Sequence, residues 1–379
     1  MPRRLLYIAT LFLLPLICTA CTWGGNVPKT THETNIPTPT PSPIRLGPQP
    51  CPGSTGNPTS WESIIPPGSG QHVAHVLCGN LMGVSALQAV VMVVHDDYAS
   101  LLDIYVYTNI TTAHPTSVFT LKGLMHGDAK ISNYNTLLTA QEDPHSRVNA
   151  DLTRQWTVDL FREYKWSDSA GTLTQVAFPG IFPDLTRYQA DEEQEQVNAA
   201  QNMQQWRLSV VATTQHFVNT LLNWPADTPV TVVSGGDVHD VHAVTQVQST
   251  APGSSPITLS MDRLELNADG GIWEIGNVQT QGLTLNVPAS LPLLVSPVQV
   301  TGSVTTTAGG TASTVTIWDH WYTDSGHTTL SGTDAKFSTS VLYTLTFPNA
   351  TQEGLVGLTS TTSSLAISGI VLVKVLLRA

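Results

Sequence analysis

The sequence predicts a mainly β protein with a small α+β part, and three observations support this fold class. Thr, Val, Ser and Gly dominate much of the chain, a composition that favours pleated sheets with many turns. Short apolar or alternating runs recur, with Gly, Asn and Asp clustered between them. Apolar residues at helical spacing occur within residues 186–224. We therefore expect an N-terminal β-meander domain, a middle domain with a helix and a curved sheet, and a C-terminal β-sandwich.

Residues 1–21 have the order of charges and side-chain sizes that is typical of a secretory signal peptide. Two arginines near the start are followed by an apolar run over 5–17, and the small Thr19 and Ala20 precede Cys21. The apolar run is too short to cross a bilayer, which takes about 20 residues. The sequence therefore predicts an exported protein.

The segment Ile17-Cys18-Thr19-Ala20-Cys21 resembles the lipobox of bacterial lipoproteins, with Cys18 where that family usually has Leu, Val or Ile. The resemblance implies cleavage before Cys21 and acylation of Cys21 with chains such as palmitate. It also implies that the protein is held at the outer, extracytoplasmic face of the cell membrane. The alternative is an ordinary signal cleaved near Ala20, which would release the protein.

Residues 22–60 are expected to form a tether. The stretch 37–43 alternates Pro with Thr or Ser, and Pro cannot donate to a helix or sheet ladder because it lacks the N–H. Such a stretch favours extended polyproline II at about 3.1 Å per residue. We interpret the segment as a passive spacer rather than a Pro-rich recognition motif.

Cys51 and Cys78 are the two cysteines left once Cys18 leaves with the signal and Cys21 takes the lipid. In an oxidising compartment the natural interpretation is a disulfide between them. A metal or redox role would call for a CxxC spacing or a second pair, and the chain after Cys21 has neither.

Residues 61–185 are expected to form a β-rich domain. Gly, Asn and Asp separate strand-like runs, as turns require. The expected arrangement is a meander, either one antiparallel sheet or part of a propeller-like blade. The expected strands are 86–95, 101–107, 117–121, 136–141, 160–166 and 173–178.

Residues 186–282 are expected to form an α+β domain. A polar stretch and then apolar residues at helical spacing predict a long helix that ends at Pro225. A long helix followed by a curled sheet resembles the cystatin-like or ketosteroid-isomerase-like cone, with 270–275 as its closing segment. The expected strands are 229–233, 242–247, 257–264 and 271–278.

Residues 283–379 are expected to form a β-sandwich of short strands. The segment from Ser296 to Gly302 and the valine-rich stretch 371–377 are similar to the Ig-like domain of bacterial spore-germination proteins and surface lipoproteins. That resemblance implies a binding or scaffolding module without catalytic residues. A membrane helix over 365–377 is the rival interpretation, but this segment is too short and contains Lys374. The expected strands are 283–288, 295–302, 314–318, 336–340, 343–347, 354–360 and 370–377.

The segment with the densest set of potential metal ligands contains Asp237, His239, Asp240 and His242. Carboxylate and imidazole groups together suit a divalent metal ion. The segment follows Ser-Gly-Gly, however, which is typical of a turn, and a solvated hairpin is the favoured alternative.

The candidate ligand-binding residues are Trp318, His320, Trp321 and Tyr322. Aromatic faces beside polar groups can stack on sugar rings. On a strand, Trp318 and His320 would lie on one face and Trp321 on the other. One face must fill the core, and core packing plus an exposed hairpin end is the favoured alternative because aromatic side chains dominate core energetics.

Several chemistries are not indicated by the sequence. A net charge of −12 gives no electrostatic footprint for nucleic acid. The chain has no HExxH, GxSxG, phosphate loop or GxGxxG, and no cofactor is expected. The acidic run 191–195 could supply a glycosidase pair, but a solvated helix face is the favoured interpretation.

These observations predict a non-enzymatic, lipid-anchored envelope protein that acts as a binding or scaffolding module. Its expected partners are the membrane, through the N-terminal lipid, and a cell-wall polymer or another envelope protein. The alternatives are a ligand- or glycan-binding lipoprotein and, third, a hydrolase of cell-wall polymers.

Overall fold

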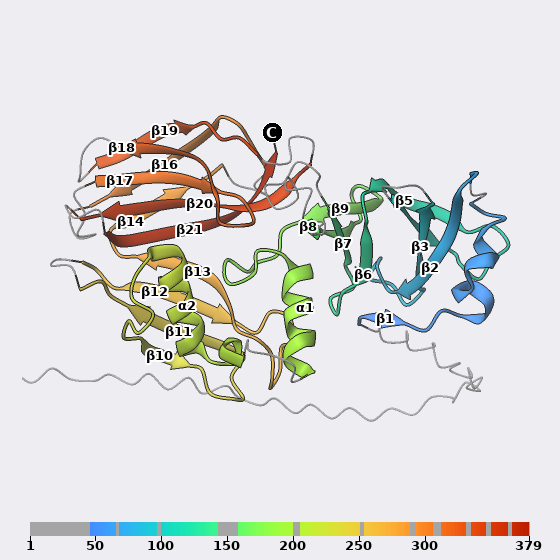
Figure 1. Cartoon of the computed structure of the whole chain (residues 1–379), viewed down its shortest axis with the longest axis horizontal. Helices are drawn as coiled ribbons and strands as arrows, with labels where there is room; N and C mark the ends of the chain where they lie inside the picture. The colour runs from blue at the N-terminus through green and yellow to red at the C-terminus, as the bar shows by residue number, and fades with distance from the viewer. Residues whose placement is uncertain are drawn as a thin grey trace, which may run out of the picture. The chain divides into compact units, whose positions relative to one another are not determined.

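The computed structural model describes the chain from residue 46 onward, with gaps. Its strands and two α-helices confirm the predicted mainly β fold class (Figure 1). The predicted signal over 1–21, Cys21 and the tether up to residue 45 lie outside the described residues. Within those residues, no helix is both long and apolar enough to cross a membrane. The described ranges are 46–65, 68–96, 100–142, 158–199, 205–250, 254–288, 293–305, 312–330, 335–345, 350–362 and 366–378.

Two antiparallel sheets form the part of the structure before residue 177. Their strands follow each other in sequence order, as in a meander. The first sheet contains β1 (Pro48–Gln49), β2 (Gln71–Gly79), β3 (Gln88–His95), β4 (Leu102–Thr108) and β5 (Thr116–Leu124). The second contains β6 (Asp128–Ile131), β7 (Leu137–Glu142), β8 (Val158–Ser167) and β9 (Thr172–Val176).

These two sheets share one apolar core, so the N-terminal part is a sandwich rather than the single sheet or propeller-like blade that we expected. Met92 and Ile104 of the first sheet pack in one cluster with Leu137 and Leu173 of the second. The other face of β3 is covered as well, by a cluster that contains Trp61. The apolar run in β3 is therefore long because both faces of this strand are buried.

The end of the predicted tether belongs to the folded part. Residues 46–61 include β1 and two short 3₁₀ turns, η1 (Gly53–Gly56) and η2 (Pro58–Trp61). The Trp61 indole is buried and donates a hydrogen bond to the Thr55 carbonyl at 2.7 Å. The predicted disulfide between Cys51 and Cys78 is confirmed, with an S–S distance of 2.09 Å. It joins this segment covalently to β2.

The helices after residue 186 are α1 (Arg187–Asn198), the short η3 (Gln205–Leu208) and α2 (Val210–Leu222). The long helix that we expected is thus divided, because the Ser209 hydroxyl caps a new helix by accepting from the Ala212 N–H at 3.3 Å. Asn223, in the left-handed conformation, ends α2 just before Pro225.

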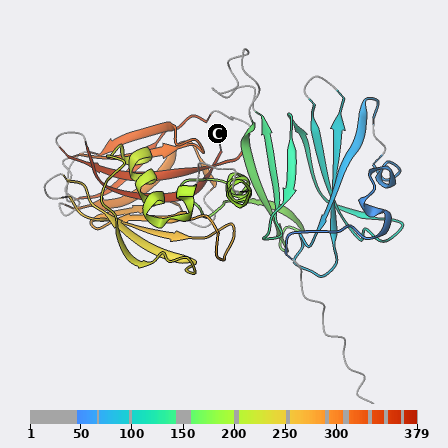
Figure 2. The same cartoon turned by 60° about the horizontal axis from the view of Figure 1, so that its bottom comes forward.

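The two helices pack against different sheets. Phe217 and Val218 of α2 pack with Leu259 and Ile275. Helix α2 thus covers one face of the sheet that is formed by the strands after it in sequence. Helix α1 instead contacts β7 and β8 (Figure 1, Figure 2), where Tyr188 stacks on Phe161 at a centroid distance of 5.2 Å. Helix α1 therefore joins the N-terminal sandwich to the rest of the chain.

A nine-stranded sheet and a three-stranded sheet form the remaining part. The large sheet has the order β10-β11-β12-β13-β21-β20-β17-β18, with β15 paired to β21 in parallel, and the small sheet has the order β14-β16-β19. The bounds are β10 (Thr231–Gly235), β11 (His242–Val247), β12 (Ile257–Asp262), β13 (Glu274–Thr280), β14 (Leu283–Asn286), β15 (Leu293–Val295), β16 (Val298–Val304), β17 (Ala312–Trp318), β18 (Asp324–Leu330), β19 (Ala335–Val341), β20 (Gln352–Thr361) and β21 (Ile367–Arg378).

The large sheet crosses the domain boundary that we expected between residues 282 and 283. Val278 of β13 pairs with Leu372 of β21, which connects the sheet under α2 to the C-terminal sandwich. Strands β20 and β21 are apolar on both faces: Leu355 packs with α2 on one side, and Val356 packs in the sandwich on the other. Local sequence patterns do not reveal this long-range pairing.

We predict that the disulfide is a major source of stability for the N-terminal sandwich. Replacing Cys51 and Cys78 together with Ala should lower the free energy of unfolding by about 3–4 kcal/mol, because the bond closes a loop of 27 residues. Urea unfolding with and without reductant measures this difference. Reductant should destabilise the wild type and leave the double variant unchanged. Equal midpoints for both proteins in the absence of reductant would contradict the prediction.

Candidate functional site

The linker from residue 177 to 186 connects β9 to α1 and is held by a buried ion pair. The Lys374 ammonium of β21 lies 2.8 Å from a carboxylate oxygen of Glu353 in β20, and both side chains are almost fully buried. Lys374 also donates to the Gly180 carbonyl at 2.9 Å, and the Phe178 N–H donates to Glu353 at 3.0 Å. The pair therefore fixes the course of the linker over the large sheet.

Burial dominates the acid–base properties of this pair. It raises the pKa of Glu353 to about 7, although the charge of Lys374 acts in the opposite direction. Burial also lowers the pKa of Lys374, opposed by the charge of Glu353. Each group thus depends on the other to remain charged in a site without solvent.

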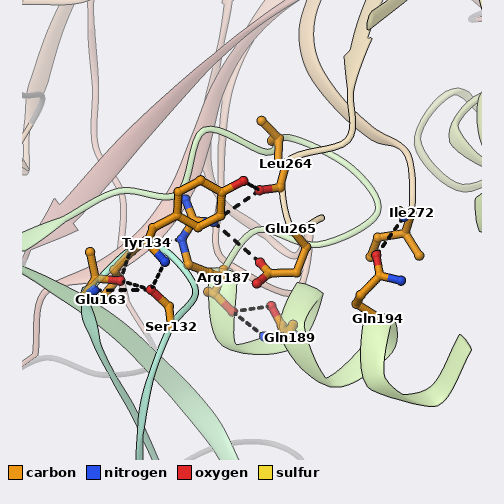
Figure 3. A network of polar contacts seen from close by, with 11 residues as sticks. Ser132, Tyr134, Glu163, Arg187, Gln189, Gln194, Leu264, Glu265 and Ile272 are labelled. Carbon is orange, nitrogen blue, oxygen red and sulfur yellow. Dashed lines mark hydrogen bonds and ion pairs between the residues drawn. The ribbon is translucent and has the colours of Figure 1, made fainter. Parts of the chain in front are cut away.

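A second buried network surrounds Arg187, the first residue of α1 (Figure 3). Its guanidinium lies 2.9 Å from Glu163 of β8 and 3.5 Å from Glu265, which follows β12. The Tyr134 ring lies over it at 4.2 Å, and the Tyr134 hydroxyl donates to the Leu264 carbonyl. Burial raises the pKa of Glu265 to about 8, while the charge of Arg187 opposes this rise.

A third network places Arg207 of η3 between acidic groups from two segments. Arg207 donates to the Asp184 carboxylate of the linker, and its Nε lies 3.8 Å from Glu193 of α1. The fully buried Glu274 belongs to the same group. Burial, followed by the negative charge of Asp184, raises the pKa of Glu274 well above its ordinary value.

The predicted aromatic site forms a turn between β17 and β18 instead of a continuous strand. Trp318 ends β17, and the Tyr322 N–H donates to the Asp319 carbonyl at 3.0 Å. His320 is buried and lies 3.1 Å from the Gln352 side-chain oxygen. Burial lowers the pKa of His320, which keeps its imidazole neutral at pH 7.

The four predicted aromatic residues therefore have different environments. The Trp318 ring packs into the core cluster beneath α2, in agreement with the packing alternative. The Tyr322 hydroxyl donates to the carbonyls of Ile181 and Pro183 at 2.7 and 3.1 Å, so this side chain also holds the linker. Trp321 remains 44% exposed.

A pocket of about 410 Å³ lies beside this turn. This volume is within the range of about 300–1,000 Å³ that is typical of small-molecule sites. The turn, the linker, β8 and α1 all contribute to it. The lining residues are Val158, Phe161, Pro183, Asp184, Gln189, Glu192, Glu193, His320, Trp321 and Tyr322.

The acidic run of α1 is not the solvated helix face that we expected. Asp191 lies 3.4 Å from the Lys130 ammonium, and Glu192 and Glu193 line the pocket. Gln194 is buried and accepts from the Ile272 N–H at 2.8 Å. Sequence reasoning missed these roles because the partners come from distant segments; a glutamine within an acidic run is the one local signal.

The proposed metal ligands do not form one group. Asp237 and Asp240 are within a turn, where the Asp237 N–H donates to the Asp240 carboxylate at 2.9 Å. His239 instead contacts Asp269 at 2.8 Å, and His242 contacts a different carboxylate, Asp262. Across the described part of the chain, no three His, Cys, Asp or Glu residues are arranged to hold a metal ion. The hairpin alternative agrees with this geometry.

A second pocket, of about 550 Å³, lies along Thr258, residues 279–285 and Val371. Its lining contains hydroxyl, amide and aliphatic groups but neither an aromatic nor a charged side chain. The pocket at Trp321 therefore has the more distinctive chemistry.

No protein-family model and no curated protein matches this chain.

We predict that replacing Lys374 with Met destabilises the protein by about 3–5 kcal/mol, because Glu353 is left buried without its cation. Urea unfolding measures the change. Lys165→Met, at an exposed position of β8, is the matched control and should have little effect. Adding Glu353→Gln should restore part of the loss. Equal effects of Lys374→Met and Lys165→Met would contradict the prediction.

We also predict that stability falls as pH rises from about 4.5 to 8. The folded protein keeps a proton on Glu265 up to a pKa of about 8, whereas the unfolded chain loses it near the ordinary value of 4.5. The folded state thus binds more protons across this interval, and raising the pH favours unfolding. Glu265→Gln should make the fall shallower, as measured by urea unfolding at pH 5 and pH 8. Exposed Glu195→Gln should leave the fall unchanged; parallel curves for Glu265→Gln and wild type would rule out this origin.

Proposed function

We propose that this chain is a lipid-anchored extracytoplasmic envelope protein that acts as a non-catalytic binding or scaffolding module. The observation that carries the proposal is the lipobox-like segment ending at Cys21, followed by a Pro/Thr-rich stretch. Lipid on Cys21 would hold the protein at the outer face of the membrane. Two or more acyl chains make such attachment stable, since each buried CH₂ contributes about 0.8 kcal/mol.

Several features of the folded part support this proposal. The disulfide between Cys51 and Cys78 is of the kind that persists in an oxidising compartment. The segments on which the Ig-like resemblance rests coincide with β16 and β21, which face each other in the C-terminal sandwich. A rigid, β-rich unit of this kind is suited to presenting surfaces to an envelope partner.

The non-catalytic part of the proposal rests on how the buried acids are used. Glu353 lies beside Lys374, Asp184 beside Arg207, and Glu163 beside Arg187. Paired groups of this kind, which connect the linker and α1 to both sandwiches, are typical of structural ion networks. A glycosidase would need two carboxylates on opposite sides of one bond.

The pocket at Trp321 favours a second candidate, a ligand-binding lipoprotein. Trp321 is among the large apolar side chains that remain exposed, and it shares the pocket with polar groups of α1. An exposed indole next to hydrogen-bonding groups is a frequent feature of small-molecule sites. In this second candidate the anchor is the same, and the pocket supplies the binding function.

The anchor is tested by producing the full chain in bacteria that are fed an alkyne-labelled palmitate analogue. We expect the wild type to carry the label and to fractionate with membranes. Cys21→Ala should lose both properties, while Cys18→Val, which introduces a residue usual at that lipobox position, should keep them. Label on the Cys21→Ala protein would overturn the assignment of this residue. Unlabelled wild-type protein in the medium would indicate an ordinary signal peptide.

A further inference from the structure

The pocket beside Trp321 has two chemically different sides. Trp321, Tyr322 and Phe161 contribute aromatic groups, whereas the α1 side contributes Glu192 and Glu193. Trp321 is 44% exposed, so its indole is accessible to a ligand. A ligand that fits both sides must combine an apolar body with a group that interacts well with carboxylates.

The polar side consists mainly of hydrogen-bond acceptors. Asp184, Glu192 and Glu193 carry carboxylates, which when ionised can only accept. The cation nearest to Glu193 in the described structure, Arg207, lies at 3.8 Å, and the Lys130 ammonium lies at the same distance from Glu192. Both distances exceed that of a normal hydrogen bond.

One oxygen of Glu193 is left without a match. Its Oε2 is buried 3.8 Å from the Nε of Arg207, and neither atom has a hydrogen-bond partner among the described residues. Burial raises the pKa of Glu192 and of Glu193, and the nearby cations lower it only in part. Added positive charge at this side of the pocket would therefore be stabilising, whereas an anionic ligand would be repelled.

We infer that this pocket binds a small organic cation, a protonated amine carried on a compact ring or aliphatic body. The ammonium lies against the carboxylates of Glu192 and Glu193, and the body packs on the Trp321 indole. An ammonium offers donors to the acceptor groups of α1 and is attracted to the face of an indole. The inference rests on the second candidate function and names its ligand class.

Charge complementarity separates this ligand class from neutral sugars. A neutral pyranose could also stack on the indole, but its hydroxyls carry no charge to balance the carboxylates. The net charge of −12 attracts cations toward the protein and repels anions. The inference therefore selects an amino sugar or another amine over an acetylated or neutral sugar.

The test measures binding by isothermal titration calorimetry of the purified full chain in an uncharged detergent. Glucosamine and N-acetylglucosamine share one ring, and only glucosamine carries an ammonium; lysine methyl ester is an amine without a sugar ring. We expect glucosamine to bind at least about tenfold more tightly than N-acetylglucosamine, a ratio that corresponds to about 1.4 kcal/mol. Binding of lysine methyl ester as well would show that the amine alone is sufficient, whereas binding of glucosamine alone would identify an amino-sugar site.

Variants locate the binding in the pocket. Glu192→Gln and Trp321→Ala should each weaken glucosamine binding by about fivefold or more, because each removes one side of the site. Glu195→Gln, at an exposed position of the same helix, is the matched control and should bind like the wild type. Unchanged melting temperatures show that the variants are folded, and Lys130→Ala should not weaken binding if Glu192 acts on the ligand directly.

Two results would overturn the inference in different ways. Equal binding of N-acetylglucosamine and glucosamine, unaffected by Glu192→Gln but weakened by Trp321→Ala, would leave a neutral-sugar site and a ligand-binding protein. If none of the three probes gives binding heat at a concentration of about 10 mM, both the inference and the ligand-binding function of this pocket are overturned. The lipid anchor is measured separately and is unaffected by either result.

Discussion

The ion pair between Lys374 and Glu353 is the interaction on which the arrangement of the chain most depends. It is nearly free of solvent and places a cation and an anion beneath the linker. Through the carbonyl of Gly180 and the N–H of Phe178, it determines where the linker crosses the large sheet. The linker in turn positions Asp184 and the start of α1, so the pocket at Trp321 is built on this pair. Replacing such a pair with well-packed apolar residues is often neutral, whereas removing one partner alone is strongly destabilising.

The sequence was sufficient to predict the fold class and most strands, because these follow from local patterns. The run over 257–264 alternates, and the structure places β12 there with one face in the core under α2. The strands that were missed have weaker patterns. β18 (Asp324–Leu330) is polar and owes its conformation to pairing with β17, and β2 carries two histidines in place of a regular apolar alternation. Pairing energy from a neighbour is not visible in a window of local sequence.

The site was less predictable than the fold because it, too, depends on contacts between segments that are distant in sequence. The aromatic run 318–322 was recognised, and the expected strand ended at Trp318. The turn that follows depends on the Asp319 carboxylate, which accepts from the N–H groups of Trp321 and Thr323. That turn leaves the Trp321 indole exposed, whereas the neighbouring His320 is buried. The carboxylates of the pocket come from α1 and the linker, and the nearby cations, Lys130 and Arg207, come from other segments of the chain. Only the folded chain brings these charges together.

The position of β21 within its sheet has a consequence for how the protein is made. A chain is synthesised from its N-terminus, and β1 to β9 find all of their sheet partners among one another. Strand β13 instead pairs with β21, which is the last strand of the large sheet in sequence and is therefore synthesised after all the others. Contacts between such distant segments form slowly, and until they form, β13 is an unpaired edge that other chains can join. Newly made protein should therefore be most prone to aggregation in its C-terminal half, after the N-terminal sandwich has folded.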